Sequence, residues 1–236
     1  MTDWKRWLRD INITLDDTQE RQFSTYYETL VAWNQKMNLT GITEEYEVYE
    51  KHFYDSLLAS CCYPFMNVST LADIGGGAGF PGIPLKICFP HLQLTVIDAT
   101  KKRIQFLQHL VKELALENVN VIHMRAEDAA REVNHRDHYD VVIARAVAKM
   151  PVLAELCLPF TRTNGVWIAM KGKSGEEEKI AAAGAIQTLN GGEIDQHYFE
   201  LPTEASDRRV YVIGKTKGTP KAYPRKAGTI EKKPLQ

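Results

Sequence analysis

The stretch that decides the fold reads Leu71-Ala72-Asp73-Ile74-Gly75-Gly76-Gly77-Ala78-Gly79-Phe80-Pro81-Gly82. It begins as an apolar strand that carries an acid, and it continues directly into a glycine-rich turn. Glycine has no Cβ and adopts positive φ at little cost, so such a turn lets a ligand approach the backbone closely. The stretch therefore predicts a ligand-binding turn at the end of the first strand of a sheet.

On the carboxyl-terminal side of this turn, β-rich runs alternate with amphipathic stretches. The predicted strands are Thr70–Ile74, Leu92–Ile97, Val119–His123, Tyr139–Ala144 and Gly165–Met170. The predicted helices are Pro81–Cys88, Lys101–Leu116, Met150–Phe160 and Ser174–Leu189. This alternation is typical of right-handed crossovers and a mainly parallel α/β sheet.

The last two β-rich runs, Gly192–Leu201 and Arg208–Lys215, have no long helix between them. We expect them to pair as antiparallel neighbours, which gives a mixed sheet of about seven strands. Ser174 and Glu177 have the spacing of a capping box at the start of the preceding helix. Gly191-Gly192 is expected to end that helix.

Three helices are predicted before the sheet, at Trp4–Arg9, Asp16–Asn38 and Glu44–Cys62, because apolar residues recur there at offsets of three and four. The chain is therefore divided into an N-terminal helical extension or lid (1–66), a sheet domain (67–215) and a tail (216–236).

The composition places the chain among ordinary globular proteins, with 236 residues of which 44% are hydrophobic, and a net charge of −1. It has no apolar run of about 18 residues and no secretory signal at its start, so we predict a cytoplasmic protein without a membrane span. The four cysteines form no Cys-x-x-Cys pair and read as buried free thiols. No metal site is predicted, and a monomer is expected.

The tail has a different charge from the rest of the chain. Residues 215–236 contain seven Lys or Arg and one acid, a net charge of +6, interleaved with Pro and Tyr. Such a segment suits contact with nucleic-acid phosphates. A solubilising disordered tail is the alternative.

A second acid ends the second predicted strand, which reads Thr95-Val96-Ile97-Asp98, and it follows Gly79 by 19 residues. An acid about 20 residues beyond a glycine turn can accept hydrogen bonds from both hydroxyls of a ribose. The turn and the acid together predict a cofactor that contains a nucleoside.

Gly77, Gly79 and Gly82 also fit the dinucleotide-binding pattern Gly-x-Gly-x-x-Gly, so an NAD(P)-dependent oxidoreductase is an alternative. Asp73 counts against it, because a fixed carboxylate at the turn repels a pyrophosphate but attracts a sulfonium or an amino group. Pro81 also crowds the start of the next helix. The pattern resembles that of the class I S-adenosylmethionine-dependent methyltransferases, which have a Rossmann-like fold, and S-adenosylmethionine is the predicted cofactor.

Further candidate residues follow the later strands. Ala126-Glu127 lies after the third strand, where a carboxylate or backbone group can meet the adenine amine; the helix dipole alone also favours Glu127 there. Arg145 ends the fourth strand and Lys171 the fifth, so both are aimed at the mouth of the cleft. The alternatives are an ion pair of Arg145 with Asp98, Glu127 or Asp140, and a solvated strand end for Lys171.

The residues after the fourth strand narrow the range of atoms that could accept the methyl group. They lack the Asn/Asp-Pro-Pro-aromatic loop used for exocyclic amines, and they lack a cysteine that could attack a pyrimidine carbon. A ring nitrogen such as guanine N7 needs neither, because its lone pair is already available. Arg and Lys are common donors to guanine O6 and N7.

Seven motifs make the chain resemble the RsmG (GidB) family of bacterial small-subunit rRNA methyltransferases over nearly its whole length. They are Trp33-Asn34-x-x-Met37-Asn38-Leu39-Thr40, His52-Phe53-x-Asp55-Ser56-Leu57, the glycine turn, Lys102-Arg103-Ile104-x-Phe106-Leu107, Arg145-Ala146, Lys171-Gly172 and Tyr223-Pro224-Arg225-Lys226-x-Gly228. The first, second and last of these are unusual among methyltransferases in general, which makes the resemblance specific.

The resemblance implies methylation of N7 of a guanosine in 16S rRNA, with the small ribosomal subunit as partner and S-adenosylhomocysteine as the second product. Together with the reasoning above, it gives three sets of site residues. The cofactor set is Asp73, Gly75, Gly77, Gly79, Phe80, Asp98, Ala126, Glu127 and Arg145. The catalytic set is Arg145, Lys171 and Asn38, and the RNA-binding set is Lys171, Arg225, Lys226 and His52.

Some alternatives stay open at this point. Asn38 could simply end its helix, and His52 and Asp55 could satisfy each other locally. The whole protein could also be a non-catalytic ribosome-assembly factor that binds RNA and retains the fold.

Overall fold

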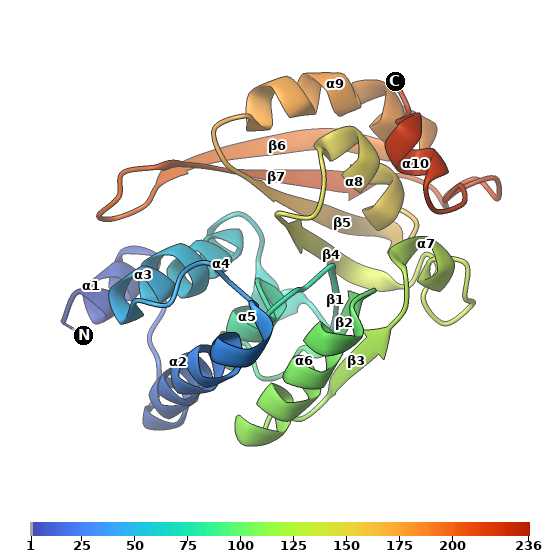
Figure 1. The fold of residues 1–236 in the computed structure, drawn as a ribbon. Coiled ribbons are helices and arrows are strands. Elements are labelled where there is room, and N and C mark those ends of the chain that lie inside the picture. The colour runs from blue at the N-terminus through green and yellow to red at the C-terminus, as the bar shows by residue number, and fades with distance from the viewer. Residues whose placement is uncertain (1) are drawn as a thin grey trace.

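A single seven-stranded sheet runs through the computed structural model, which describes residues 2–236 (Figure 1). Its strand order is β3-β2-β1-β4-β5-β7-β6. The strands are β1(Thr70–Ile74), β2(Gln93–Asp98), β3(Val119–His123), β4(Tyr139–Arg145), β5(Thr161–Lys171), β6(Gly191–Glu200) and β7(Asp207–Lys215). The first five are parallel, and β7 is antiparallel to both β5 and β6. The predicted mixed sheet with an antiparallel final pair is confirmed.

Helices cover both faces of the sheet. Those before and between the first strands are α1(Thr2–Asp10), α2(Asp17–Met37), α3(Glu45–Val48), the π-helical turn η1(Tyr49–Tyr54), α4(Asp55–Leu57), the 3₁₀ turns η2(Leu58–Cys61) and η3(Phe65–Asn67), α5(Gly82–Cys88) and α6(Lys101–Glu113). The later ones are α7(Ala126–Ala129), α8(Met150–Cys157), α9(Gly175–Thr188) and α10(Thr229–Lys232). Figure 1 shows α8, α9 and α10 on one face and α2, α5 and α6 on the other.

The two-residue period of the strands gives each face its own core. Along β4, Val141 and Ile143 belong to the core under α5, α6 and the N-terminal helices. Val142 and Ala144 belong to the core under α8 and α9. Alternate side chains of a strand point to opposite faces, so an uninterrupted apolar run is what a strand buried on both faces requires.

The N-terminal helices share the first of these cores. In α2, Phe23, Tyr26 and Leu30 are fully buried, and the Tyr26 hydroxyl donates to the Ala78 carbonyl of the glycine turn at 2.5 Å. Asp16 caps the helix by a reciprocal pair of hydrogen bonds with Gln19. Because α2 is bonded directly to the glycine turn, residues before the sheet help to position the ligand site.

Three local predictions are wrong. The predicted helix Glu44–Cys62 is interrupted, because Tyr49–Tyr54 forms a π-helical turn. Ser174 and Glu177 form no capping box; Ser174 Oγ instead donates to Glu178 Oε1 at 2.9 Å. Gly191 begins β6 rather than ending α9, because α9 already ends at Thr188.

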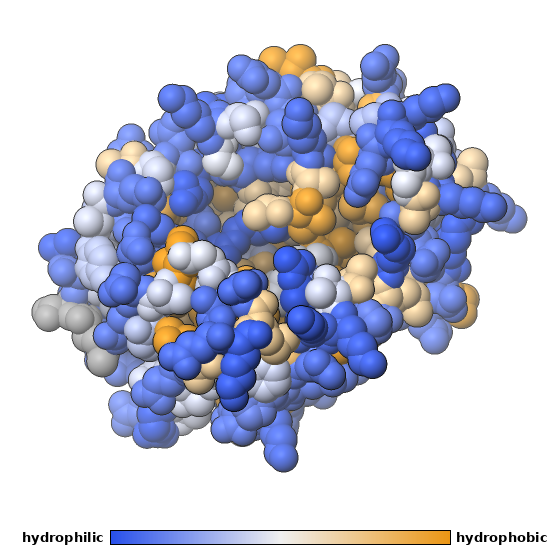
Figure 2. Space-filling model, viewed as in Figure 1, coloured by the Kyte–Doolittle hydropathy of each residue, from blue (hydrophilic) through white to orange (hydrophobic). Residues whose placement is uncertain are grey.

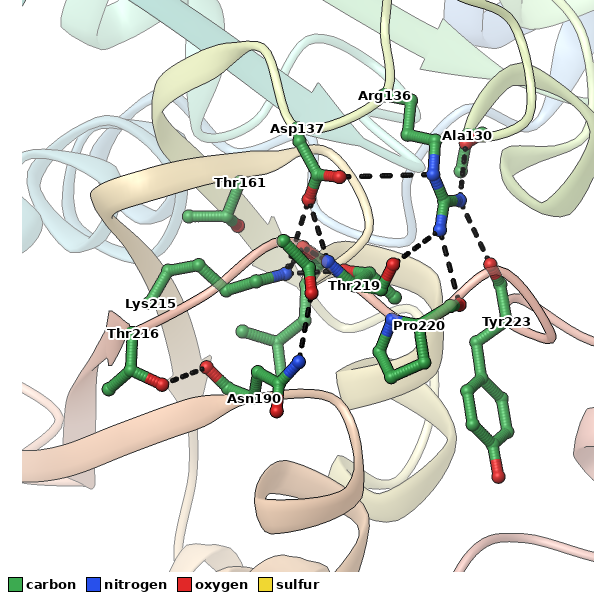
Figure 3. A network of polar contacts seen from close by, with 12 residues as sticks. Ala130, Arg136, Asp137, Thr161, Asn190, Lys215, Thr216, Thr219, Pro220 and Tyr223 are labelled. Carbon is green, nitrogen blue, oxygen red and sulfur yellow. Dashed lines mark hydrogen bonds and ion pairs between the residues drawn. The ribbon is translucent and has the colours of Figure 1, made fainter.

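The chain after β7 is packed against the sheet domain. Arg136 donates to the backbone carbonyls of Thr219 (2.8 Å) and Tyr223 (2.9 Å), and the buried Lys215 donates to the Leu158 carbonyl (2.6 Å) (Figure 3). Ile230 of α10 is buried. The segment therefore follows a defined path over α8, and free disorder does not describe it.

Among the described residues, no helix combines the length and the apolar character needed to span a membrane.

Candidate functional site

The buried side chain of Asp73 packs against the glycine turn. This side chain has no exposed surface, and its Oδ2 accepts a hydrogen bond from the Gly82 N–H at 2.8 Å. A Cβ on Gly76 or Gly82 would lie within 3.0 Å of Asp73 Oδ2. The buried carboxylate therefore leaves no room for a side chain at either glycine. Asp73 therefore stabilises the turn from inside, through its hydrogen bond with the Gly82 backbone. Its Oδ1 has no hydrogen-bond partner within residues 2–236.

Asp98 fastens the outer side of the same turn. Its Oδ2 accepts from the Gly77 N–H at 3.1 Å, and its Oδ1 accepts from the Thr100 N–H at 2.7 Å. Arg103 Nη1 lies 3.4 Å from Asp98 Oδ2. The end of β2 is thereby bonded to the turn that follows β1. Ribose binding by Asp98 stays a prediction.

The π-helical turn brings His52 and Asp55 to the cleft. A π-helix closes i→i+5 hydrogen bonds and is typical of single turns at functional sites. His52 stacks on Phe80 of the glycine turn, with ring centroids 4.6 Å apart, and its Nε2 pairs with Thr40 Oγ1 at 2.8 Å. Burial and the charge of Arg145 lower the pKa of His52 to about 3, so its imidazole is neutral.

Arg145 joins these parts. Its Nη1 donates to Asp55 Oδ2 at 2.8 Å and to the backbone carbonyls of Lys51 (3.4 Å) and His52 (3.3 Å). Its guanidinium also lies over the Phe80 ring, 5.1 Å from the centroid. The alternative of an ion pair between Arg145 and Asp98, Glu127 or Asp140 is wrong in its partner, because Asp55 takes that place.

A pocket of about 520 Å³ opens beside Arg145, at the carboxyl ends of β4 and β5. Its lining is Lys51, His52, Asp55, Arg145, Ala146, Val147, Ala148, Lys149, Met170, Lys171, Gly172, Ser174, Glu178 and Arg208. Figure 2 shows this face of the molecule hollowed near its centre, with both hydrophilic and hydrophobic residues around the hollow. The pocket reaches the glycine turn through Val147, because a Cβ on Gly75 would lie 2.7 Å from its side chain.

Lys171 holds one wall of the pocket. Its Nζ donates to the Ala148 carbonyl at 2.6 Å and pairs with Glu178 Oε2 at 2.7 Å. The Lys171 side chain is 9% exposed, so it is not a solvated strand end. The loop from Ala146 to Lys149 is therefore fixed in place.

Asn38 ends α2 in the left-handed conformation (φ 48°) and is exposed, so the alternative that it terminates the helix is confirmed. It is not among the residues that line the pocket. The idea that His52 and Asp55 satisfy each other is wrong, because His52 pairs with Thr40 and Asp55 pairs with Arg145 and Arg208. Catalysis by Asn38 stays a prediction.

Ala126 and Glu127 begin α7, beside the end of β2, where the Met124 N–H donates to the Asp98 carbonyl at 3.2 Å. Both residues are partly buried. Adenine contact at this position stays a prediction.

Arg225 and Lys226 lie away from the pocket lining. The Arg225 guanidinium donates to both oxygens of Glu155, with Nε–Oε1 at 3.0 Å and Nη2–Oε2 at 2.6 Å, and the Glu155 side chain is fully buried. The guanidinium predicted to bind RNA is thus engaged with α8. Lys226, the next residue, is exposed.

Arg208 is a pocket residue that the sequence analysis missed. It lies on β7 and donates from Nε to Asp55 Oδ1 at 3.0 Å, so Asp55 bridges two arginines. The pairing of β7 with β5 sets Arg209 beside Lys171, so Arg208 also comes to the end of β5. The sequence analysis paired this strand only with the run before it, and the pairing with β5 that brings Arg208 to the pocket was not predicted.

The residues around the turn suit a nucleoside cofactor with a cationic end. A Cβ on Gly77 would meet no protein atom closer than 3.8 Å, so the backbone is open to a ligand there. Asp98 lies at the base of that opening, and Asp73 Oδ1 is a buried acceptor with no partner in the part of the chain that the structure describes. In the described residues, no three His, Cys, Asp or Glu side chains gather as metal ligands.

Asp73 should make stability depend on pH. Burial raises the pKa of its carboxyl from 3.8 to about 7, so between about pH 4 and pH 7 the folded protein binds a proton that the unfolded chain lacks. The free energy of unfolding therefore falls as pH rises through this window. His52, with its pKa lowered from 6.5 to about 3, has the opposite slope below pH 6.5.

Because these slopes overlap, the measurement compares urea unfolding of the wild type and Asp73→Asn at several pH values. We expect the wild type to lose stability relative to Asp73→Asn as pH rises from 4 to 7. A difference that is constant with pH would contradict the raised pKa. Asp128→Asn, at an exposed carboxylate of α7, serves as the control.

Comparison with known proteins agrees with this geometry. A family model, GidB, described as rRNA small subunit methyltransferase G, matches residues 19–204. The chain is 52% identical over 223 residues to "Ribosomal RNA small subunit methyltransferase G" of Brevibacillus brevis, covering 94% of each chain. It is 50% identical over 235 residues to the protein of that name from Halalkalibacterium halodurans, covering 100% of this chain and 99% of the relative.

Solved structures share the fold at low sequence identity. An O-methyltransferase from Bacillus cereus in complex with SAH has a TM-score of 0.60 and 16% identity, covering 89% of this chain and 96% of that chain. A putative O-methyltransferase from Klebsiella pneumoniae has a TM-score of 0.58 and 11% identity, covering 90% and 96%. Both support the predicted class I methyltransferase architecture.

Proposed function

The chain belongs to the rRNA small subunit methyltransferase G family, and from that membership we propose that it methylates N7 of a guanosine in 16S rRNA, with S-adenosylmethionine as the methyl donor. The reaction takes place in the cytoplasm on the small ribosomal subunit. The observation that carries the proposal is the position of Arg145, which contacts the glycine turn through Phe80 and lines the basic pocket.

The cofactor supplies an electrophilic methyl group on a positively charged sulfur. In the proposal, the backbone of Gly75 and Gly77 and the acceptor oxygens of Asp98 hold it, with Ala126 and Glu127 at the adenine. Transfer to a ring nitrogen needs alignment and electrostatics rather than a general base, because N7 already has a lone pair. The rigid wall formed by Arg145 and Lys171 supports that alignment.

The neutral imidazole of His52 fits this scheme as a packing surface. It is stacked on Phe80 and does not repel a cation bound at the turn. A charged imidazole in the same place would oppose a sulfonium. His52 is therefore assigned to shaping the junction between cofactor and RNA.

Gly77→Ala tests the cofactor position. The new methyl group meets no protein atom closer than 3.8 Å, although φ is +59°, so the protein should fold with a cost of about 1 to 2 kcal/mol. We expect the affinity for S-adenosylhomocysteine, measured by calorimetry, to fall by about tenfold or more, since tenfold corresponds to only about 1.4 kcal/mol. Gly228→Ala, which also adds a methyl in open space at positive φ and lies outside the pocket lining, is the control. Unchanged affinity in Gly77→Ala would place the cofactor elsewhere.

The exposed lysines Lys226, Lys232 and Lys233 are the part of the tail proposed to attract RNA phosphates. Removing the whole tail would also remove the buried Ile230, so charge substitution is the cleaner test. The triple Lys→Gln variant should bind RNA more weakly, with a salt slope smaller by up to about 0.9 per lost contact, and should keep its affinity for S-adenosylhomocysteine. An unchanged salt slope would exclude these three lysines from the RNA interface.

The decisive experiment incubates the protein with labelled S-adenosylmethionine and small subunits that lack the modification, and then maps the labelled base by mass spectrometry. The expected product is 7-methylguanosine. Label on another base or atom would overturn the proposal. Titration with NADH, which should show no binding, tests the oxidoreductase alternative, and turnover itself excludes a purely binding role.

A further inference from the structure

Two acids line the basic pocket, and they differ in how their oxygens are used. Glu178 is engaged with the wall: Oε2 accepts from Lys171 Nζ at 2.7 Å and from the Met150 N–H at 2.9 Å, and Oε1 accepts from Ser174 Oγ at 2.9 Å. Asp55 is the other acid. Since Glu178 fixes the loop and helix α9, Asp55 is the acid to consider for substrate contact.

Asp55 keeps hydrogen-bonding capacity on both oxygens. Within residues 2–236, Oδ1 accepts one hydrogen bond, from Arg208 Nε at 3.0 Å, and Oδ2 accepts one, from Arg145 Nη1 at 2.8 Å. A carboxylate oxygen accepts two, so each retains one lone pair. The two arginines, one from β4 and one from β7, also fix the orientation of the carboxylate plane.

Two adjacent acceptors match one edge of one base. Guanine presents two donors side by side, N1–H and the N2 amine, on its Watson–Crick edge. Adenine presents an acceptor, N1, at the first of these positions. Bases extruded from RNA are commonly read along this edge. A base held there leaves N7, on its other ring, free of the carboxylate.

The surroundings make such a contact selective. Asp55 is 5% exposed, so a donor or acceptor left unmatched beside it is poorly compensated by water. A site built to hydrogen-bond its substrate strongly rejects analogues that lack the matching group. Lys149, an exposed cation of the pocket lining, suits a phosphate of the same nucleotide.

We propose that Asp55 is the residue that selects guanine, by accepting hydrogen bonds from N1–H and the N2 amine of the extruded base while N7 faces the methyl donor. This inference rests on the proposed N7 methylation. It assigns to the π-helical turn, which delivers Asp55 to the pocket, the reading of the base.

The first test needs no variant of the protein. Wild-type enzyme is given small subunits reconstituted with guanosine or with inosine at the target position. Inosine lacks only the N2 amine and retains N7. Single-turnover methyl transfer should be about tenfold to 100-fold slower on inosine, the size expected for one hydrogen bond to a charged group. Equal rates would overturn the inference.

The second test uses Asp55→Asn. Asparagine carries one acceptor and one NH₂ donor, so it accepts from N1–H but opposes the N2 amine. We expect the guanosine rate to fall and the ratio of guanosine to inosine rates to drop to near one or below. Glu178→Gln, the matched change at the other acid, can slow both substrates but should keep the wild-type ratio. S-adenosylhomocysteine binding verifies that each variant is folded.

The outcomes separate the two proposals. If the wild type makes 7-methylguanosine but treats inosine equally, the role of Asp55 fails and the proposed function stands. If Asp55→Asn keeps the wild-type ratio, Asp55 merely positions Arg145 and Arg208. If no 7-methylguanosine is formed on guanosine subunits, both proposals are overturned.

Discussion

Arg145→Ala should lower the rate of methyl transfer at saturating cofactor by about 100-fold or more. The guanidinium bonds Asp55 and two carbonyls of the π-helical turn, and it packs on Phe80 of the glycine turn. Removing one preorganised charged donor from an active site costs about 100-fold to 1000-fold. The measurement is single-turnover transfer to small subunits that lack the modification.

Arg145→Lys should lose most of this activity as well. A lysine keeps the charge and one donor nitrogen, but it lacks the planar guanidinium that lies over the Phe80 ring. Arg162→Ala is the control, because Arg162 pairs with Asp140 at the opposite end of the sheet and is half-exposed. A rate within tenfold of the wild type in both Arg145 variants would remove Arg145 from the catalytic set.

Arg225→Ala should lower the free energy of unfolding by about 3 kcal/mol, because it leaves the fully buried Glu155 carboxylate without its ion-pair partner. Denaturant unfolding measures this change. Lys226→Ala alters the exposed neighbour and should stay within about 0.5 kcal/mol of the wild type.

A double variant separates structure from RNA binding at this position. Replacing the pair by apolar residues, Arg225→Met with Glu155→Leu, removes the unpaired charge and should recover much of the lost stability. If Arg225 instead served RNA, Arg225→Ala would weaken RNA binding and leave the unfolding free energy unchanged. That result would restore the role predicted from the tail composition.

The tail shows where composition misleads. Seven basic residues predicted a segment for contact with phosphates, but Lys215 is buried at the end of β7 and Arg225 is bonded to the sheet domain. Burial and cross-chain pairing decide which cations stay available to a ligand. Lys215 pairs with Asp137, 78 residues away in the sequence, and Arg225 pairs with Glu155, 70 residues away.

Local sequence determined the sheet and the glycine turn, because both depend on near neighbours. Strands need alternating or continuous apolar runs, and the turn needs glycines at φ of +71°, +59° and +97° for Gly75, Gly77 and Gly79. The alternation of strands and helices then determined that the crossovers are right-handed. In this arrangement Asp98, about 20 residues beyond the turn, lies beside the turn.

Tertiary structure alone decided the pocket and the partners within it. Asp55 meets Arg145 and Arg208 across 90 and 153 residues, and no local pattern records which of several acids an arginine will choose. The buried state of Asp73 and the π-helical turn likewise depend on packing between the N-terminal helices and the sheet. The sequence offers each arginine several acids as ion-pair partners. Only the folded chain decides which of these charged side chains are buried away from water, and a buried charge needs a partner.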